Sequence, residues 1–154
     1  MAYAWLGRVH GDLGEAALSA ESSSKAYQLR DRASDQEKFW ITAAYDTQVT
    51  ENLEKARETC EAWPQTYPRE VIPHAFLAGI IYPVLGKYDQ SVDEAKKAIE
   101  LDPDFATAYH VLAVRYQNLD RLGEAENTLD RASERRLELP DFLLERLRRR
   151  LSER

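Results

Sequence analysis

Small residues recur at a nearly constant spacing along this 154-residue chain. Ser19, Ala56, Ser91 and Ala125 follow one another at intervals of 37, 35 and 34 residues. Periods in this range are typical of proteins that stack one supersecondary unit on the next. The spacing therefore predicts an array of similar units, in which each unit covers the apolar face of its neighbour.

A second pattern precedes each of these small positions. Four sets of residues have the spacing x, x+3, x+4 and x+7, which places each set on one face of an α-helix. Small residues in each set would let two helices of a hairpin approach closely, while the large ones fill the space beside them. The sets are Tyr3, Leu6, Gly7 and His10; Trp40, Ala43, Ala44 and Thr47; Ala75, Ala78, Gly79 and Tyr82; and Tyr109, Leu112, Ala113 and Tyr116.

Together with Pro68 and Pro103 near the ends of two units, these patterns resemble the tetratricopeptide repeat, a helix-turn-helix unit of 34 residues. The resemblance implies an all-α fold, a right-handed α-α superhelix (solenoid) of about four repeats in a single domain over residues 1–154. Asp31 and Leu137 stand where the family places a closing proline. The repeats are expected at about residues 1–34, 37–70, 72–105 and 106–139.

Prolines and serines modify this expectation locally. Pro73 suits the first turn of a helix, whereas Pro83 predicts a kink or an early helix end at Tyr82. The stretch "ESSSK" at 21–25 is poor helix material, because serine side chains compete for backbone hydrogen bonds. We expect those serines to lie on a solvated helix face, with phosphorylation as the alternative.

The C-terminal segment carries a leucine stripe and several arginines. Leu143, Leu144, Leu147 and Leu151 share one helical face. This pattern predicts a capping helix at about 141–152, since terminal repeats need a cover with a polar outer face. Binding of an anionic partner by the arginines is a compatible second role.

Catalytic, metal-binding and cofactor-binding patterns are missing from the sequence, so we expect no enzyme activity, no metal and no cofactor. The three histidines lie in three different repeats without ligand spacing, and His74 has no evident carboxylate partner. Cys60 falls at an apolar position and is expected to be a buried structural thiol. Carboxylates such as Glu94 are expected on solvated outer faces.

Charge and hydropathy exclude other classes of partner. The net charge is -6, and residues 31–130 hold 19 acidic against 10 basic side chains, which disfavours nucleic acid. No apolar run approaches the roughly 20 residues of a membrane helix, and no secretory leader is recognisable. We therefore expect a cytoplasmic protein that binds neither nucleic acid nor membranes.

In the tetratricopeptide family, the first helices of the repeats line a concave groove that binds peptides. The resemblance implies a non-catalytic protein-protein interaction scaffold that holds a peptide or partner protein in this groove. The family's carboxylate clamp is not matched at Ala4, Arg8, Ile41 and Tyr45. The groove residues implied are Arg8, Lys38, Ile41, Tyr45, Gln48, Phe76, Ile80, His110, Val114 and Gln117.

Self-association and a spacer role remain open beside peptide binding. A second copy could fill an apolar groove, giving a homo-oligomer. Residues 25–70 also resemble repeat regions of bacterial multidomain proteins, in which the repeats follow a Ser/Thr protein kinase or a transcriptional regulator domain. Residue 1 falls inside the first expected helix with no capping residue before it, so we expect a fragment of a longer chain. In that setting the repeats would serve as an oligomerisation or spacer module.

Overall fold

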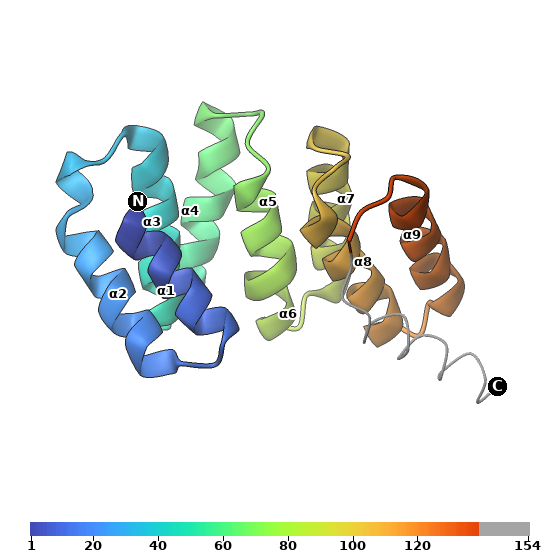
Figure 1. Ribbon diagram of the computed structural model, residues 1–154, viewed down its shortest axis with the longest axis horizontal. Coiled ribbons are helices and arrows are strands. Elements are labelled where there is room, and N and C mark those ends of the chain that lie inside the picture. The colour runs from blue at the N-terminus through green and yellow to red at the C-terminus, as the bar shows by residue number, and fades with distance from the viewer. Residues whose placement is uncertain (139–154) are drawn as a thin grey trace. The chain divides into compact units, whose positions relative to one another are not determined.

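The computed structural model describes residues 1–138, and helices are the only regular secondary structure in that range (Figure 1). No helix in the described range is long and apolar enough to cross a membrane. The elements are α1 (Ala2–Asp12), α2 (Ala16–Gln28), η1 (Arg30–Arg32), α3 (Asp35–Gln48), α4 (Leu53–Thr66), α5 (Ile72–Phe76), η2 (Leu77–Ile81), α6 (Tyr82–Val84), α7 (Tyr88–Leu101), α8 (Ala106–Asn118) and α9 (Leu122–Glu134).

Two compact parts divide the chain, an N-terminal half (Met1–Arg69) and a C-terminal half (Glu70–Arg154). The N-terminal half holds the hairpins α1–α2 and α3–α4, and the C-terminal half holds the hairpin of α5, η2, α6 and α7 followed by α8–α9. The repeat boundaries and the single domain stay predictions. The capping helix expected at about 141–152 lies outside the described residues.

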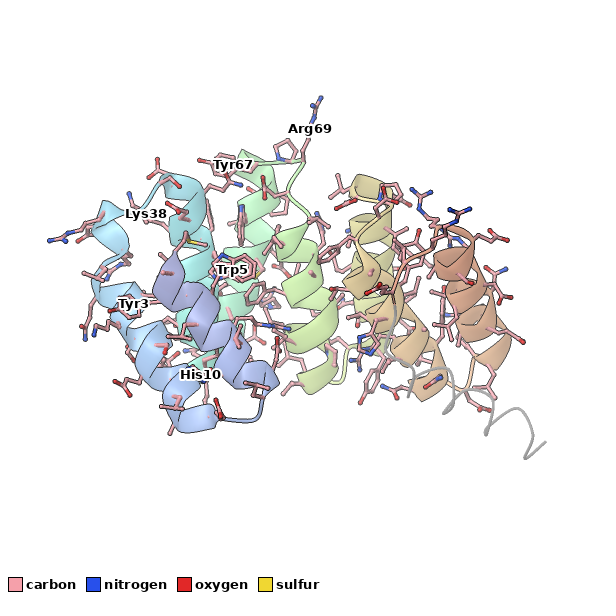
Figure 2. The ribbon with its side chains drawn as sticks, in the orientation of Figure 1. Tyr3, Trp5, His10, Lys38, Tyr67 and Arg69 are labelled. Atoms are coloured by element: carbon pink, nitrogen blue, oxygen red, sulfur yellow. The ribbon has the colours of Figure 1, made fainter. Side chains whose placement is uncertain are left out.

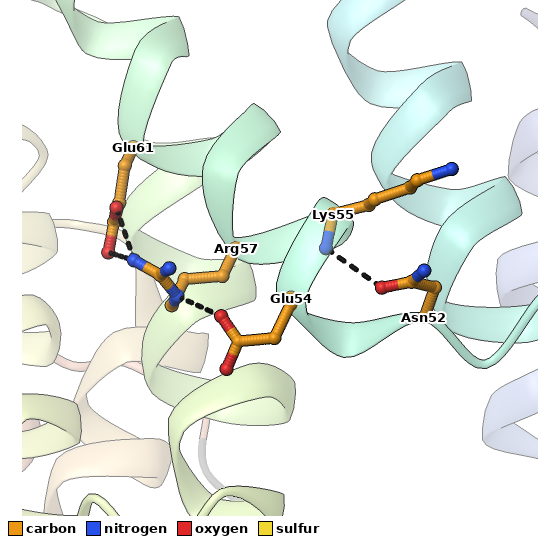
Figure 3. A network of polar contacts seen from close by, with 5 residues as sticks. All are labelled: Asn52, Glu54, Lys55, Arg57 and Glu61. Carbon is orange, nitrogen blue, oxygen red and sulfur yellow. Dashed lines mark hydrogen bonds and ion pairs between the residues drawn. The ribbon is translucent and has the colours of Figure 1, made fainter.

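Side chains at the helix starts explain why α3 and α4 begin where they do. Ser34 and Glu37 form a reciprocal capping box, in which the Ser34 N–H donates to Glu37 Oε2 at 2.8 Å. Asn52 caps α4 by accepting the Lys55 N–H at 3.1 Å (Figure 3). Along the exposed side of α4, Arg57 pairs with two glutamates, one on each neighbouring turn.

In the α1–α2 hairpin, Gly7 of α1 packs closely against Ser19 and Ser23 of α2. A Cβ added to Gly7 would lie 3.2 Å from the Ser19 carbonyl oxygen, so a larger residue does not fit without movement. The Ser19 hydroxyl donates to the Gly7 carbonyl at 2.8 Å. Ser22 and Ser23 are buried as well, at 8% and 1% exposure, so the prediction that they lie on a solvated face is wrong.

Helix α1 also buries a different face from the one that the x, x+3, x+4 and x+7 spacing predicts. Ala4 and Gly7 are buried, whereas Tyr3 and Leu6 are 38% and 44% exposed. In α8, by contrast, all four residues of the corresponding set are buried. The close approach at Gly7 fixes the contact line of α1, and this leaves Tyr3 and Leu6 at its flanks.

Pro83 distorts its helix in a different way from the one predicted. The helix runs from Ile72 to Val84 and does not end at Tyr82, but its middle, η2, is a π-helical turn. The Tyr82 N–H bonds to the Leu77 carbonyl, five residues back, and Pro83 has no N–H to donate. The Ala78 carbonyl therefore loses its intrahelical donor, and the Ser91 hydroxyl of α7 replaces it at 2.6 Å.

The C-terminal half is held together by one hydrophobic cluster that joins α7, α8 and α9. Tyr109, Leu112 and Leu129 are among its buried members, each at most 4% exposed. The Tyr109 hydroxyl is satisfied by the Pro103 carbonyl at 3.1 Å, which ties α8 to the turn before it. Both second helices of this half are therefore fixed against the same first helix, α8.

Candidate functional site

Four of the expected groove residues lie on α3, and three of them, Ile41, Tyr45 and Gln48, are buried or have partners inside the N-terminal half. Tyr45 stacks on Tyr27 of α2, with ring centroids 4.0 Å apart. Gln48 accepts a hydrogen bond from Ser23, and Ile41 is 2% exposed. These side chains are used in holding α2 against α3.

The two basic residues expected in the groove pair with neighbours on their own helices. Arg8 bonds Asp12 at 3.0 Å, and Lys38 bonds Asp35 at 2.9 Å (Figure 2 labels Lys38). The hydrogen bond to Asp35 and its negative charge raise the pKa of Lys38. Lys38 also lines a shallow hollow of about 570 Å³ between α3 and α4, whose wall includes Phe39.

The remaining expected residues belong to the C-terminal half and divide by exposure. Phe76 and Gln117 are buried, at 4% and 0% exposure, whereas Ile80, His110 and Val114 are half-buried. η2 and α8 contact each other, and Gly79 lies close to Val111: a Cβ added to Gly79 would be 3.5 Å from Val111 Cγ2.

Ile80 and Val114 lie within about one helical turn of the contact between Gly79 and Val111. Each of them shares a helical face with a residue four positions away. Val84 lies four residues after Ile80 and is 69% exposed. His110 lies four residues before Val114. We call Ile80, Val84, His110 and Val114 the first-helix face of the C-terminal half.

The electrostatics of this face are set by the imidazole of His110, which is near the positive charge of Arg115. Burial, together with the positive charge of Arg115, lowers the pKa of His110 below its ordinary value. Burial also lowers the pKa of the Arg115 guanidinium. No ion pair joins Arg115 to a carboxylate within residues 1–138. A neutral histidine can donate and accept hydrogen bonds beside the aliphatic side chains.

A partly buried cluster of polar contacts around Glu94 in the same half was missed by the sequence analysis. His74 Nδ1 lies 2.6 Å from Glu94 Oε2, and Lys97 Nζ lies 2.7 Å from Glu94 Oε1. His74 and Glu94 are 9% and 8% exposed, so the expectation of a solvated Glu94 is wrong. Burial alone would raise the pKa of Glu94, but the hydrogen bonds from His74 and Lys97 outweigh burial and lower it.

A second hollow, of about 500 Å³, lies between α7 and α9 and was also not foreseen. Its floor includes Leu112 and Tyr116, and the cations of Lys96 and Arg121 lie over the Tyr116 ring at 5.9 and 4.7 Å. The walls of this hollow come from α7 and α9, the second helices, which the groove expectation did not consider. The sequence did contain one indication of this hollow, namely the aromatic Tyr116 together with the basic residues Lys96 on α7 and Arg121 at the start of α9.

The described residues offer little to a metal ion or a nucleophilic mechanism. No group of three or more His, Cys, Asp or Glu within residues 1–138 is arranged to hold a metal. Cys60 is in no disulfide and its side chain is fully buried, as the sequence predicted.

Comparison with known proteins bears on the fold. A family model described as tetratricopeptide repeat matches residues 76–105. A thermophilic TPR protein of Thermus thermophilus, TTC0263, superposes with a TM-score of 0.66 at 22% identity, covering 97% of this chain and 80% of that one. A crystal structure of MamA gives a TM-score of 0.61 at 20% identity, covering 86% of this chain and 75% of that one.

The search of curated protein sequences gives no match to this chain. The helical hairpins, the matched repeat and the likeness to these two structures agree with one another, and they confirm the predicted all-α fold of tetratricopeptide solenoids. Residues 76–105 match the tetratricopeptide repeat, and the described part of the chain has the fold of tetratricopeptide-repeat structures.

Proposed function

We propose that this chain is a non-catalytic interaction scaffold that binds a peptide segment of a partner protein on the first-helix face of its C-terminal half. The observation that carries the proposal is that the exposed Val84 and the half-buried Ile80, His110 and Val114 lie on two neighbouring first helices. The residues expected on α3 have partners within the protein, so they are less available to a ligand.

The chemistry of this face defines the peptide it favours. Three of its four side chains are aliphatic, so a ligand gains free energy by burying aliphatic side chains, at about 25 cal/mol per Å² before ordering costs. His110 can bond a peptide N–H or carbonyl. The charge of Arg115 near His110 favours a carboxylate beside the apolar anchor. The proposed ligand is therefore an extended peptide with an aliphatic anchor and an adjacent acidic residue.

Selection from a phage-displayed peptide library on the immobilised protein tests this proposal. The double variant Ile80→Ser with Val114→Ser replaces two of the three aliphatic side chains of the face, of which Val114 also packs against the core cluster. We expect the selected peptides to bind it at least about 10-fold more weakly, because two anchoring contacts are lost.

The matched control is Leu18→Ser with Leu101→Ser, which changes two exposed leucines elsewhere. It should bind the selected peptides with unchanged affinity, and far-UV circular dichroism checks that both variants are folded. Equal binding by the Ile80/Val114 variant would remove the first-helix face from consideration.

A further inference from the structure

Exposed large apolar side chains concentrate at one end of the sequence. Among residues 1–138, eleven large hydrophobic side chains are exposed, and eight of them lie within the first 29 residues. Four of these side chains lie on α1 or at its end, and they are 44% to 68% exposed. They are Trp5, Leu6 and Val9 in the helix and Leu13 at its C-cap. Among the described helices, α1 therefore exposes the most large apolar side chains to solvent.

These four side chains share one face of α1. At about 100° per residue, Trp5, Val9, Leu13 and Leu6 fall within an arc of about 100°, and Ala2 falls inside the same arc. The opposite side of the helix carries Ala4, Gly7 and Gly11, with Ala4 and Gly7 buried. We call the exposed arc the outer face of α1.

A helix that is apolar on both sides is typical of a helix packed between two layers. The inner side of α1 contacts α2 and α3. Trp5, at one edge of the outer face, also contacts Trp40 of α3, with ring centroids 4.5 Å apart, and half of its surface stays exposed. Exposed patches of a few hundred Å² that contain aromatic and branched residues mark interaction sites more than ordinary surface.

Charge decides which kind of partner fits. Residues 1–30 hold three basic and three acidic side chains, whereas residues 31–130 hold 10 basic and 19 acidic ones. The charged residues that border the outer face are paired with each other, Arg8 with Asp12 and His10 with Glu15. The outer face is thus the neutral part of an acidic protein. Two copies that met through residues 31–130 would bring like charges together, which costs free energy.

From this combination we propose that the outer face of α1 is a self-association surface, where α1 of a second copy packs against α1 in a two-fold dimer. Leu6, Val9 and Leu13 repeat with the 3-and-4 spacing of a helix–helix seam, and a two-fold contact needs a patch complementary to itself. This surface differs from the first-helix face, and the proposal does not depend on peptide binding.

The size of the face sets the expected strength. A patch of ~500 Å² on each copy buries ~1,000 Å² in the dimer, near the lower limit for a specific interface. The expected dissociation constant is therefore on the order of 10 µM. The protein should be a monomer when dilute and a dimer when concentrated.

Sedimentation equilibrium from about 1 to 500 µM tests the proposal directly. The wild-type mass should rise from 17.7 kDa toward twice that value. Val9→Glu places a carboxylate at the centre of the seam and should raise the dissociation constant at least about 30-fold. Leu101→Glu, the same kind of change at an exposed leucine on α7, is the matched control and should dimerise like wild type.

A charge exchange shows whether one outer face meets another. Val9→Lys alone should also remain monomeric, and an equimolar mixture of Val9→Glu with Val9→Lys should regain a dimer, because opposite charges then face each other. Circular dichroism confirms that each variant is folded. A wild-type protein that stays at 17.7 kDa throughout overturns the proposal, as does equal weakening by Leu101→Glu or a mixture that stays monomeric.

Discussion

The hairpins α1–α2 and α8–α9 share one sequence spacing and yet bury different faces. In α8 the set at 109, 112, 113 and 116 is buried throughout. In α1 the corresponding set has only Gly7 buried. The spacing rule therefore predicts that two helices pair, but the side chains of the second helix decide which face of the first one is covered.

The second helices of these hairpins, α2 and α9, differ in the size of the side chains that face the first helix. α9 presents Leu122, Leu129 and Ala125 to α8, so large residues on both helices interdigitate. α2 presents Ser19 and Ser23 to α1, and these approach the backbone at Gly7 closely. Serine hydroxyls fill little volume, so Tyr3 and Leu6 stay partly exposed, and the ring of Tyr3 meets α2 through the cation of Lys25, 4.9 Å from its centroid.

Removing the aromatic residue from each first helix is the strongest test of this contrast. Tyr109→Ala should destabilise the protein by about 3–5 kcal/mol, because a fully buried ring and its bond to Pro103 are lost. Tyr3→Ala should cost under about 1 kcal/mol, since Tyr3 is 38% exposed. Urea unfolding followed by circular dichroism measures both values. Similar costs at the two positions would mean that the two hairpins do not differ as described.

Two equivalent serines give a smaller and sharper comparison. Ser91→Ala should cost about 2 kcal/mol, because the buried Ala78 carbonyl loses its replacement donor. Ser19→Ala should cost about 1 kcal/mol, because the Gly7 carbonyl also accepts a bond within its own α-helix. Urea midpoints of the two variants provide the measurement. The explanation given for the π-helical turn fails if Ser19→Ala is the more damaging change.

The smallest expected effect concerns acid and is confined to the C-terminal half. The lowered pKa of Glu94 gives stability that is complete above the unfolded-state value of 4.5 and is lost as the pH falls through the lower folded-state value. The stability difference between wild type and Glu94→Gln should therefore shrink by about 1 kcal/mol between pH 7 and pH 3.5.

Glu126→Gln, at an exposed position on α9, is the control for this titration. Urea unfolding at the two pH values should give it the same small difference from wild type at both. Hydrogen exchange of the α5 and α7 amides would locate the acid-sensitive contact. A Glu94→Gln difference that does not change with pH would show that the His74–Glu94 contact contributes no pH-dependent stability.

The sequence predicted helix type and pairing well, since both depend on spacing and residue size. The positions of Ser19, Ala56, Ser91 and Ala125 all lie on buried faces of second helices. The π-helical turn was not predictable in this way, because it depends on where the donor missing at Pro83 is replaced. The burial of Ser22 and Ser23 likewise depends on how closely α1 approaches.

The candidate site was harder to foresee than the fold. Family positions place Ile41, Tyr45 and Gln48 toward a groove, but contacts with α2 depend on the particular side chains of that helix. The pairing of His74 with Glu94 joins residues 20 apart on two helices, and no local pattern indicates it. The inference about α1 could not come from spacing either, because only the structure shows which side of that helix is covered.

The bond between Ser91 and Ala78 has a consequence for how the chain folds. The helix that contains Pro83 cannot complete its own ladder of backbone hydrogen bonds, and its missing donor comes from α7. Secondary structure at this point therefore depends on tertiary structure. Without α7, the Ala78 carbonyl would need water as its donor, so the docking of α7 stabilises the widened turn.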